Sequence, residues 1–436
     1  MDVTFLGTAS AQPSTTRNHS SLALRTDGDV WLFDCGEATQ HQLIRLNGDP
    51  KTLAVRDPMD PNAAAKDIVP PKMSRVSAVF LTHLHGDHCF GLPGFLCTVG
   101  SVVRIGEERD PIHVYGPQGT KSYVRGVLDA TQSRIGRGIV IHEMLLPSHL
   151  SHTDDLELVA KLSMTRPPHI DELEGSDFFA SSFTTAESMN PADWYWTIIT
   201  GNEQGKSGAS RLTVQASPIP HTVPTVGYFI TEPQIPGRLR ADQITPILQR
   251  NKAALGLKNP MILLSKIKNG ETLTMPDGTI LVPSEFTEPA RRGRRVLILG
   301  DTSNAEDSAL VKLVDELKKP DGTFNSNAEE CLVDLVIHEA TNSCLASDIA
   351  TGLTLDSVES TTIEHGHSTP QMAARFARRV GAGRLVLNHF SSRYKGDADE
   401  ASLLVMEEVR QLAVDVFGND RVVCARDFMN VSVPSK

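Results

Sequence analysis

Short apolar, β-branched runs recur along the chain, and four of them end in a side chain that can bind a metal ion or transfer a proton. These runs are "AVFLTH", which ends at His83, "RVLILGD", which ends at Asp301, "LVDLVIHE", which ends at His338 and Glu339, and "RLVLNH", which ends at His389. Runs of this length and composition predict buried strands. We therefore expect four strands that each present a polar group at the C-terminal end.

Three longer segments have the periodicity of amphipathic helices. They cover residues 304–319, 368–380 and 399–417. The second has Ser368 or Thr369 as its N-cap and Pro370 in its first turn. Strands that alternate with helices predict a layered α/β fold, in which functional sites gather at the strand ends.

Composition and charge set the broad class. The chain has 436 residues, 40% of them hydrophobic, a formal net charge of −11 and six cysteines that form no CxxC pair. Scattered cysteines fit reduced thiols in a cytosol-like compartment. No basic leader is present, and no apolar run approaches the ~20 residues that span a bilayer. We expect a cytoplasmic protein without a membrane partner, with nuclear or mitochondrial import left open.

Two internal segments depart from the average charge. Residues 142–204 hold eleven acidic and two basic residues, and they are interpreted as an acidic surface insertion. Its "PSHLSHTDDLE" stretch could be mistaken for a second metal site. Residues 236–295 hold eleven basic and five acidic residues, a net charge of +6. This segment is either a solvated loop or hairpin, or a basic arm that grips a phosphate backbone and releases its counterions.

The densest chemistry lies in "THLHGDHCFGL", where His83, His85, Asp87 and His88 follow a predicted strand directly. A lone histidine in an apolar run is usually a core residue, but four such groups in six positions can be aimed into one small volume. Imidazole and carboxylate ligands at this density suit zinc. Four ligands exceed what one tetrahedral catalytic ion uses, so two ions about 3.5 to 4 Å apart are the better interpretation.

This HxHxDH motif and its downstream partners resemble the metallo-β-lactamase superfamily, and the details resemble its ribonuclease Z family over most of the chain. "FLGTASAQPSTTRNHSS" and "WLFDCGEATQHQL" resemble the opening strands and an aspartate motif, "PIPHTVPTVGYFI" and "LGDTS" two ligand motifs, and "LNHFSSRY" the last motif. The resemblance implies one four-layer αββα sandwich over residues 1–436, with the acidic insertion at 142–204 and the basic arm at 236–295.

The resemblance also implies a division of the metal ligands and two Zn²⁺ per subunit, with Mn²⁺ or another divalent ion able to substitute. Asp301 would bridge the two ions, and Asp34 would support the centre without ligating. The remaining ligands would hold one ion through His83, His85 and His221, and the other through Asp87, His88 and His389.

"VIHEATN" and "HGHSTPQMAARFA" resemble paired loops of ribonuclease Z and would place Glu339 beside His367. The implied activity is an endoribonuclease that removes the 3′ trailer from precursor tRNA and leaves a 3′-hydroxyl on the tRNA and a 5′-phosphate on the trailer. The basic arm, with Lys258, Lys266 and Lys268, would capture the tRNA. A homodimer is implied as well.

Roles follow from the chemistry of phosphodiester cleavage. Asp87 is expected to accept a proton from the attacking water, and His367, oriented by Glu339, to protonate the leaving ribose 3′-oxygen. His367 could equally clamp the phosphate, and Arg393 could contact that phosphate or form a structural salt bridge. Two other functions stay open: a small-molecule hydrolase of the same superfamily, which has no need of the arm, and a noncatalytic RNA-binding subunit.

Overall fold

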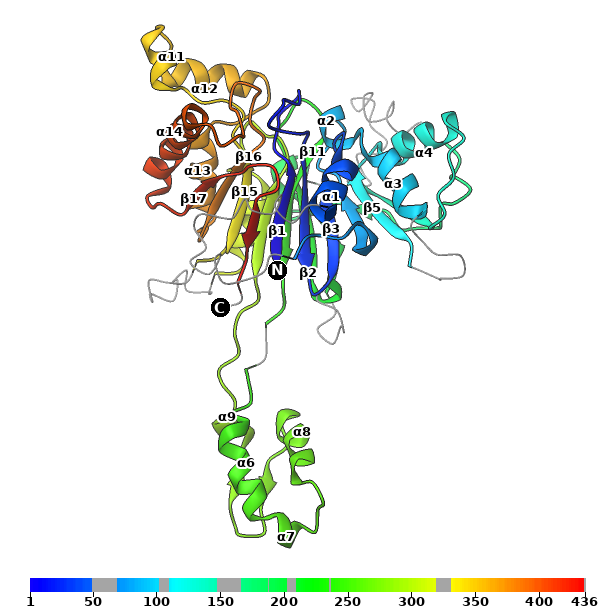
Figure 1. Ribbon diagram of the computed structural model, residues 1–436, viewed down its shortest axis with the longest axis vertical. Helices are drawn as coiled ribbons and strands as arrows, with labels where there is room; N and C mark the ends of the chain where they lie inside the picture. The colour runs from blue at the N-terminus through cyan, green and yellow to red at the C-terminus, as the bar shows by residue number, and fades with distance from the viewer. Residues whose placement is uncertain are drawn as a thin grey trace. The chain divides into compact units, whose positions relative to one another are not determined.

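The protein is described by a computed structural model covering residues 1–48, 69–101, 110–146, 166–186, 188–201, 209–234, 237–318 and 331–434. The chain divides into two compact units (Figure 1). The first contains Met1–Thr231 and Arg294–Pro434, and the second contains Glu232–Gly293. In the described residues no helix combines the length and the apolar character needed to cross a membrane.

The first unit contains two eight-stranded sheets. The first sheet has the strand order β18-β1-β2-β3-β4-β5-β6-β7, and the second has the order β17-β16-β15-β14-β11-β10-β9-β8. The strands of the first sheet are β1 (Asp2–Gly7), β2 (Ser21–Thr26), β3 (Asp29–Phe33), β4 (Val76–Phe80), β5 (Ile112–Pro117), β6 (Ile139–Leu145), β7 (Phe178–Phe179) and β18 (Asn430–Ser432). Those of the second are β8 (Ser181–Ser182), β9 (Trp194–Ile199), β10 (Thr213–Ile219), β11 (Thr225–Thr231), β14 (Arg295–Leu299), β15 (Leu335–Glu339), β16 (Leu385–Asn388) and β17 (Val422–Cys424).

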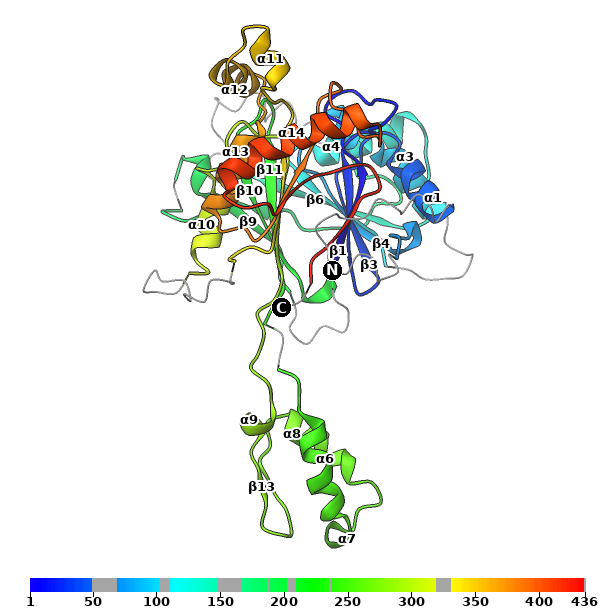
Figure 2. The ribbon, with the colours of Figure 1, turned by 60° about the vertical axis from the view of Figure 1, so that its left-hand side comes forward.

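The two sheets pack face to face, and helices cover their outer faces. One core cluster joins residues of both sheets, such as Phe80 and Tyr228, and fills the space between them. A second cluster lies under helices α10 (Ala309–Asp315), α13 (Pro370–Arg379) and α14 (Glu400–Phe417). A third lies under α1 (Thr39–Gly48), α3 (Leu92–Ser101) and α4 (Thr120–Ala130) (Figures 1 and 2). This arrangement confirms the expected four-layer αββα fold.

The four predicted strands with polar ends are β4, β14, β15 and β16. Strands β14, β15 and β16 are adjacent and parallel, so their C-terminal ends lie at one edge of the second sheet. Strand β4 lies in the first sheet. The amide of Val226, in β11 of the second sheet, donates to the carbonyl of Thr82, just after β4, at 3.0 Å. The polar strand ends of both sheets therefore meet at the same end of the sandwich.

The three predicted helices are observed in shorter form as α10, α13 and α14. In α13 the N-cap is Thr369, whose hydroxyl accepts from the Met372 amide at 3.4 Å, and Pro370 begins the first turn. In α14 the Asp399 carboxylate accepts from the Ala401 amide at the start. The prediction for 304–319 begins too early because a turn precedes Ser308, the N-cap of α10.

The remaining helices of the first unit are short or flank the strand ends. Among the described residues these α-helices are α2 (Gly86–Cys89), α11 (Ala346–Ala350) and α12 (Leu355–Glu364). Within the segment interpreted as an acidic insertion, residues 142–145 and 194–199 belong to strands β6 and β9 of the two sheets. Both strands contribute to the core, through Met144 and Trp196 among others.

The second unit has its own small hydrophobic core. Ile244, Leu248, Ile267, Met275 and Leu281 are buried together. The elements around them are α6 (Ala241–Arg250), α7 (Lys252–Leu255), α8 (Leu263–Lys268), α9 (Pro283–Phe286) and the hairpin of β12 (Leu273–Thr274) with β13 (Ile280–Leu281). The basic segment thus forms a folded unit rather than an extended loop.

Candidate metal centre

Six of the predicted ligands form two groups at the polar end of the sandwich. In the first group, His83, His85 and His221 place their ring nitrogens within 4.8 Å of one another. In the second, the ligand atoms of Asp87, His88 and His389 lie equally close together. The groups adjoin, because the ring centroids of His83, in the first group, and His88, in the second, are 4.0 Å apart.

Asp301 lies between the two groups and faces both. Its Oδ2 is 3.8 Å from His83 Nε2 and 4.0 Å from His221 Nε2. Its Oδ1 is 3.5 Å from His88 Nε2 and 3.4 Å from His389 Nδ1. One carboxylate therefore presents an oxygen to each group, which is the arrangement that a bridging ligand requires.

The loop after β4 aims its four side chains by a tight turn. Strand β4 ends at Phe80, and His85 is the N-cap of the short helix α2, which carries Asp87 and His88 in its single turn. The Ala11 amide donates to Asp87 Oδ2 at 2.7 Å and fixes that carboxylate. The loop and the helix together direct these four side chains of one hexapeptide toward the same site.

Asp34 supports the centre from behind. Its Oδ2 accepts from His88 Nδ1 at 2.7 Å, and its Oδ1 accepts from the Thr82 amide, also at 2.7 Å. The Asp34 backbone has φ 59° and that of His389 has φ 57°, in the left-handed region that non-glycine residues rarely adopt. A carboxylate that holds the outer nitrogen of a ligand histidine sets its tautomer and ring orientation.

The donor set fits divalent zinc. Burial raises the pKa of Asp301, but the neighbouring His389 and His88 outweigh this effect and hold the pKa well below its usual value. Burial lowers the pKa of His88, but Asp301 and Asp34 raise it well above the ordinary value. Asp301 and Asp34 thus favour positive charge in this buried cluster. A buried cluster of imidazole and carboxylate groups is the usual environment of zinc in proteins.

Glu339 and His367 form a pair at the side of the cluster. His367 Nδ1 lies 3.1 Å from Glu339 Oε1 and 3.7 Å from Asp301 Oδ2. Glu339 is 2% exposed and also accepts from the Thr302 amide at 2.8 Å. Burial lowers the pKa of His367, but the charge of Glu339 and its hydrogen bond outweigh burial and raise the pKa to about 9. These contacts therefore favour the protonated imidazole at neutral pH.

Two threonines in the centre carry contacts that the sequence interpretation missed. Thr341 Oγ1 donates to Glu339 Oε2 at 2.6 Å and lies 3.1 Å from His389 Nδ1. Thr82 Oγ1 lies 2.9 Å from Asp34 Oδ2 and 3.0 Å from His83 Nδ1. Thr341 lies in "VIHEATN" and Thr82 in "THLHGDHCFGL", so their position beside predicted site residues was an available signal.

The predicted phosphate contacts, Arg393 and three lysines, are not members of the two ligand groups. Arg393 is paired with Asp348 at 2.6 Å and lies over the ring of Tyr394, which is the structural alternative that the sequence left open. Lys258, Lys266 and Lys268 belong to the second unit and have exposed side chains. The "PSHLSHTDDLE" stretch, with His149, His152, Asp154 and Asp155, lies outside the described residues.

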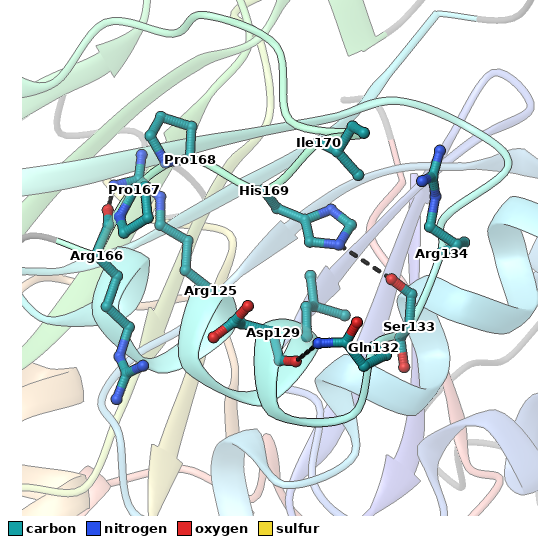
Figure 3. Close-up of a pocket in the computed structure, with 11 residues that line it drawn as sticks. Arg125, Asp129, Gln132, Ser133, Arg134, Arg166, Pro167, Pro168, His169 and Ile170 are labelled. Carbon is teal, nitrogen blue, oxygen red and sulfur yellow. Dashed lines mark hydrogen bonds between the residues drawn. The ribbon is translucent and has the colours of Figure 1, made fainter.

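A separate pocket of about 240 Å³ contains none of the cluster residues (Figure 3). It lies between α4 and residues 166–170, and His169 Nε2 lies 3.0 Å from the Ser133 carbonyl oxygen. Two of its arginines are paired with acids, Arg125 with Glu172 at 2.7 Å and Arg134 with Asp171 at 3.3 Å. This pocket is not a continuation of the candidate metal centre.

Comparison with known proteins agrees with the fold and the site. The metallo-beta-lactamase superfamily matches residues 14–159. Zinc phosphodiesterase ELAC protein 1 from Bos taurus is 34% identical over 100% of this chain and 99% of its own, and ribonuclease Z from Bacillus subtilis is 30% identical over 100% and 99%. The crystal structure of human tRNase Z, short form, covers 100% of both chains at 26% identity with a TM-score of 0.53.

The αββα sandwich with a His/Asp cluster at the strand ends defines a metallo-β-lactamase-fold protein. Within that superfamily the chain belongs to the ribonuclease Z family. Fold alone would not select a substrate, because one metal centre of this type serves several kinds of hydrolysis.

Proposed function

We propose that this protein is a zinc-dependent endoribonuclease that removes the 3′ trailer from precursor tRNA, leaving a 3′-hydroxyl on the tRNA and a 5′-phosphate on the trailer. The observation that carries the proposal is Asp301, whose two oxygens face two separate ligand groups in a member of the ribonuclease Z family. Two adjoining metal sites are the arrangement that phosphodiester cleavage exploits.

Two Zn²⁺ per subunit are part of the proposal, with Mn²⁺ or another divalent ion able to substitute. His83, His85 and His221 would hold one ion, and Asp87, His88 and His389 the other, with Asp301 shared between them. The grouping of ligand atoms within 4.8 Å supports this division. Zinc bound there supplies Lewis-acid chemistry, which polarises a phosphoryl oxygen and activates water at neutral pH.

The chain's own residues then have separate tasks. Asp87 accepts the proton of the attacking water, with Oδ2 held by the Ala11 amide. His367 is engaged with Glu339 through Nδ1, so Nε2 is the ring nitrogen left to donate a proton to the departing ribose 3′-oxygen. The alternative role of His367 as a positive clamp on the phosphate uses the same charge but transfers no proton.

Substrate capture is assigned to the second unit. Residues 236–295 carry a net charge of +6 in a chain of −11, so basic charge is concentrated in and beside this unit. Lys258 lies before α8, and Lys266 and Lys268 lie in its last turn, all with exposed side chains. Exposed lysines on a folded arm can neutralise tRNA phosphates and release counterions. A homodimer, in which each arm serves the partner's centre, completes the proposal.

The test of the function is cleavage of a precursor tRNA with a defined trailer by the purified, zinc-loaded protein. The expected products are a tRNA with a 3′-hydroxyl and a trailer with a 5′-phosphate, both mapped to the nucleotide. Asp301→Asn is the matched loss-of-function variant, since it keeps the shape of the side chain and removes the shared charge. Zinc-loaded protein that leaves every precursor intact would overturn the proposal.

A further inference from the structure

An apolar pocket adjoins the candidate metal centre on the side of His221. It has a volume of about 370 Å³, within the ~300–1,000 Å³ typical of small-molecule sites. His221 itself forms part of the wall. Unlike the pocket of Figure 3, this cavity therefore opens beside the proposed reaction centre.

The pocket is built from segments far apart in the sequence. Trp194 and Trp196 of β9, Met144 of β6 and the proline-rich segment 218–224 provide apolar walls. The indole N–H groups of Trp194 and Trp196 donate to the carbonyls of Ser188 and Leu145, at 2.9 and 2.7 Å. Their polar edges are thus already satisfied, and they offer a ligand only apolar and aromatic surface.

Gln118 is the polar side chain in this wall that has no hydrogen-bond partner among the described residues. It lies just after β5, is partly exposed, and its side-chain amide makes no hydrogen bond to any described residue. A primary amide offers two N–H donors and a carbonyl acceptor. An apolar pocket with such an amide in its wall is suited to a flat, heteroaromatic ring that carries hydrogen-bonding edges, which is the chemistry of a nucleobase.

We infer that this pocket binds the base of the nucleotide on the 5′ side of the cut, the one that keeps the 3′-hydroxyl; this inference rests on the proposed function. The choice of the 5′ nucleotide over the 3′ nucleotide depends on His221, whose Nδ1 lies 2.7 Å from the Gly366 carbonyl oxygen. Gly366 precedes His367, and the His221 and His367 rings are 5.2 Å apart. The pocket wall is therefore next to the group that protonates the departing 3′-oxygen, which belongs to that nucleotide.

The test asks whether the pocket acts on the base at one particular position of the precursor. Three precursors are compared: the normal one, one with an abasic residue 5′ of the cut, and one with an abasic residue 3′ of the cut. For the wild-type protein, loss of the 5′ base should lower kcat/KM by roughly tenfold, within the range of base stacking on protein side chains. Loss of the 3′ base should have a much smaller effect.

Val223→Trp fills the pocket from a partly exposed loop position, and Gln118→Ala removes the unpaired amide. In Val223→Trp the normal and 5′-abasic precursors should be cleaved at equal rates, and in Gln118→Ala the difference between them should shrink. Gln132→Ala, in the pocket of Figure 3, is the matched control and should keep the full tenfold difference. Zinc content is measured for each variant, so that metal loss is recognised.

The outcomes separate the two proposals. Wild-type protein that cleaves no precursor overturns the proposed function itself. Cleavage with equal rates on all three precursors overturns the base pocket and leaves the function standing. If Val223→Trp instead removes the effect of the 3′ base and keeps that of the 5′ base, the assignment of the pocket to the 5′ nucleotide is overturned. If Val223→Trp loses zinc, the test rests on Gln118→Ala. A difference in kcat/KM between the normal and 5′-abasic precursors that is unchanged in that variant overturns the inference.

Discussion

Replacing Glu339 by glutamine removes the charge that keeps His367 protonated while preserving the size of the buried side chain. Burial lowers the pKa of His367, but Glu339, with a smaller contribution from Asp301, outweighs burial and raises the pKa from 6.5 to about 9. Because the folded pKa is raised, the acid form dominates at neutral pH and is lost as the pH rises through about 9. In Glu339→Gln the pKa should fall back toward 6.5, because burial, the largest effect, lowers it and only the smaller effect of Asp301 still raises it.

The magnitude follows from the protonated fraction at pH 8. That fraction falls from about nine tenths for a pKa near 9 to about 3% for a pKa of 6.5, so a step that needs the imidazolium should slow about 30-fold. The assay is kcat/KM for precursor tRNA from pH 6 to about 10, since this ratio reports the groups of the free enzyme. The alkaline limb should move by about 2 pH units or more toward acid.

Glu172→Gln is the matched control, because Glu172 has a 5% exposed side chain and is paired with Arg125, which lines the separate pocket of Figure 3. It should leave the pH profile unchanged. A Glu339→Gln variant with normal zinc content and an unshifted alkaline limb would refute the assignment of His367 as the proton donor. Loss of zinc in that variant would refute the division between metal-holding and proton-transferring residues.

Three further outcomes are expected. Asp34→Asn weakens the hold on His88 and should lower zinc affinity by about 10- to 100-fold in a competition titration; equal affinity would contradict the supporting role. Replacing Lys258, Lys266 and Lys268 by alanine should reduce the salt slope of tRNA binding by about 2 to 3, whereas the triple arginine variant should keep it. Chelation should abolish cleavage and lower the melting temperature, and Zn²⁺ should restore both; a melting temperature indifferent to Zn²⁺ would argue against tight binding.

The local chemistry was readable because it is encoded over short distances. His83, His85, Asp87 and His88 lie within six positions, so a single turn after β4 brings them together. Capping groups such as Thr369 are likewise local, and helix α13 begins where that residue predicts. The fold class and the family were also predicted from these motifs and are confirmed.

Other features were beyond the reach of local patterns. Arg393 stands in a predicted site motif, yet its partner Asp348 is 45 residues away, and only the folded chain brings the two together. The interpretation of 142–204 by net charge overlooked that its ends are sheet strands, because charge counts do not register alternating buried positions. The roles of Thr82 and Thr341 depend on which carboxylates approach their hydroxyls.

By itself the sequence determined which side chains are available as ligands, which strands carry them and which segment concentrates basic charge. Local spacing and periodicity suffice for this, because they follow from the geometry of one turn or one strand. Tertiary structure decided that Asp301 faces both ligand groups, that Asp34 reaches behind His88, and that β5, β6, β9 and β10 enclose an apolar pocket beside His221. Those relations depend on the register and packing of two sheets, which no single stretch of the chain contains.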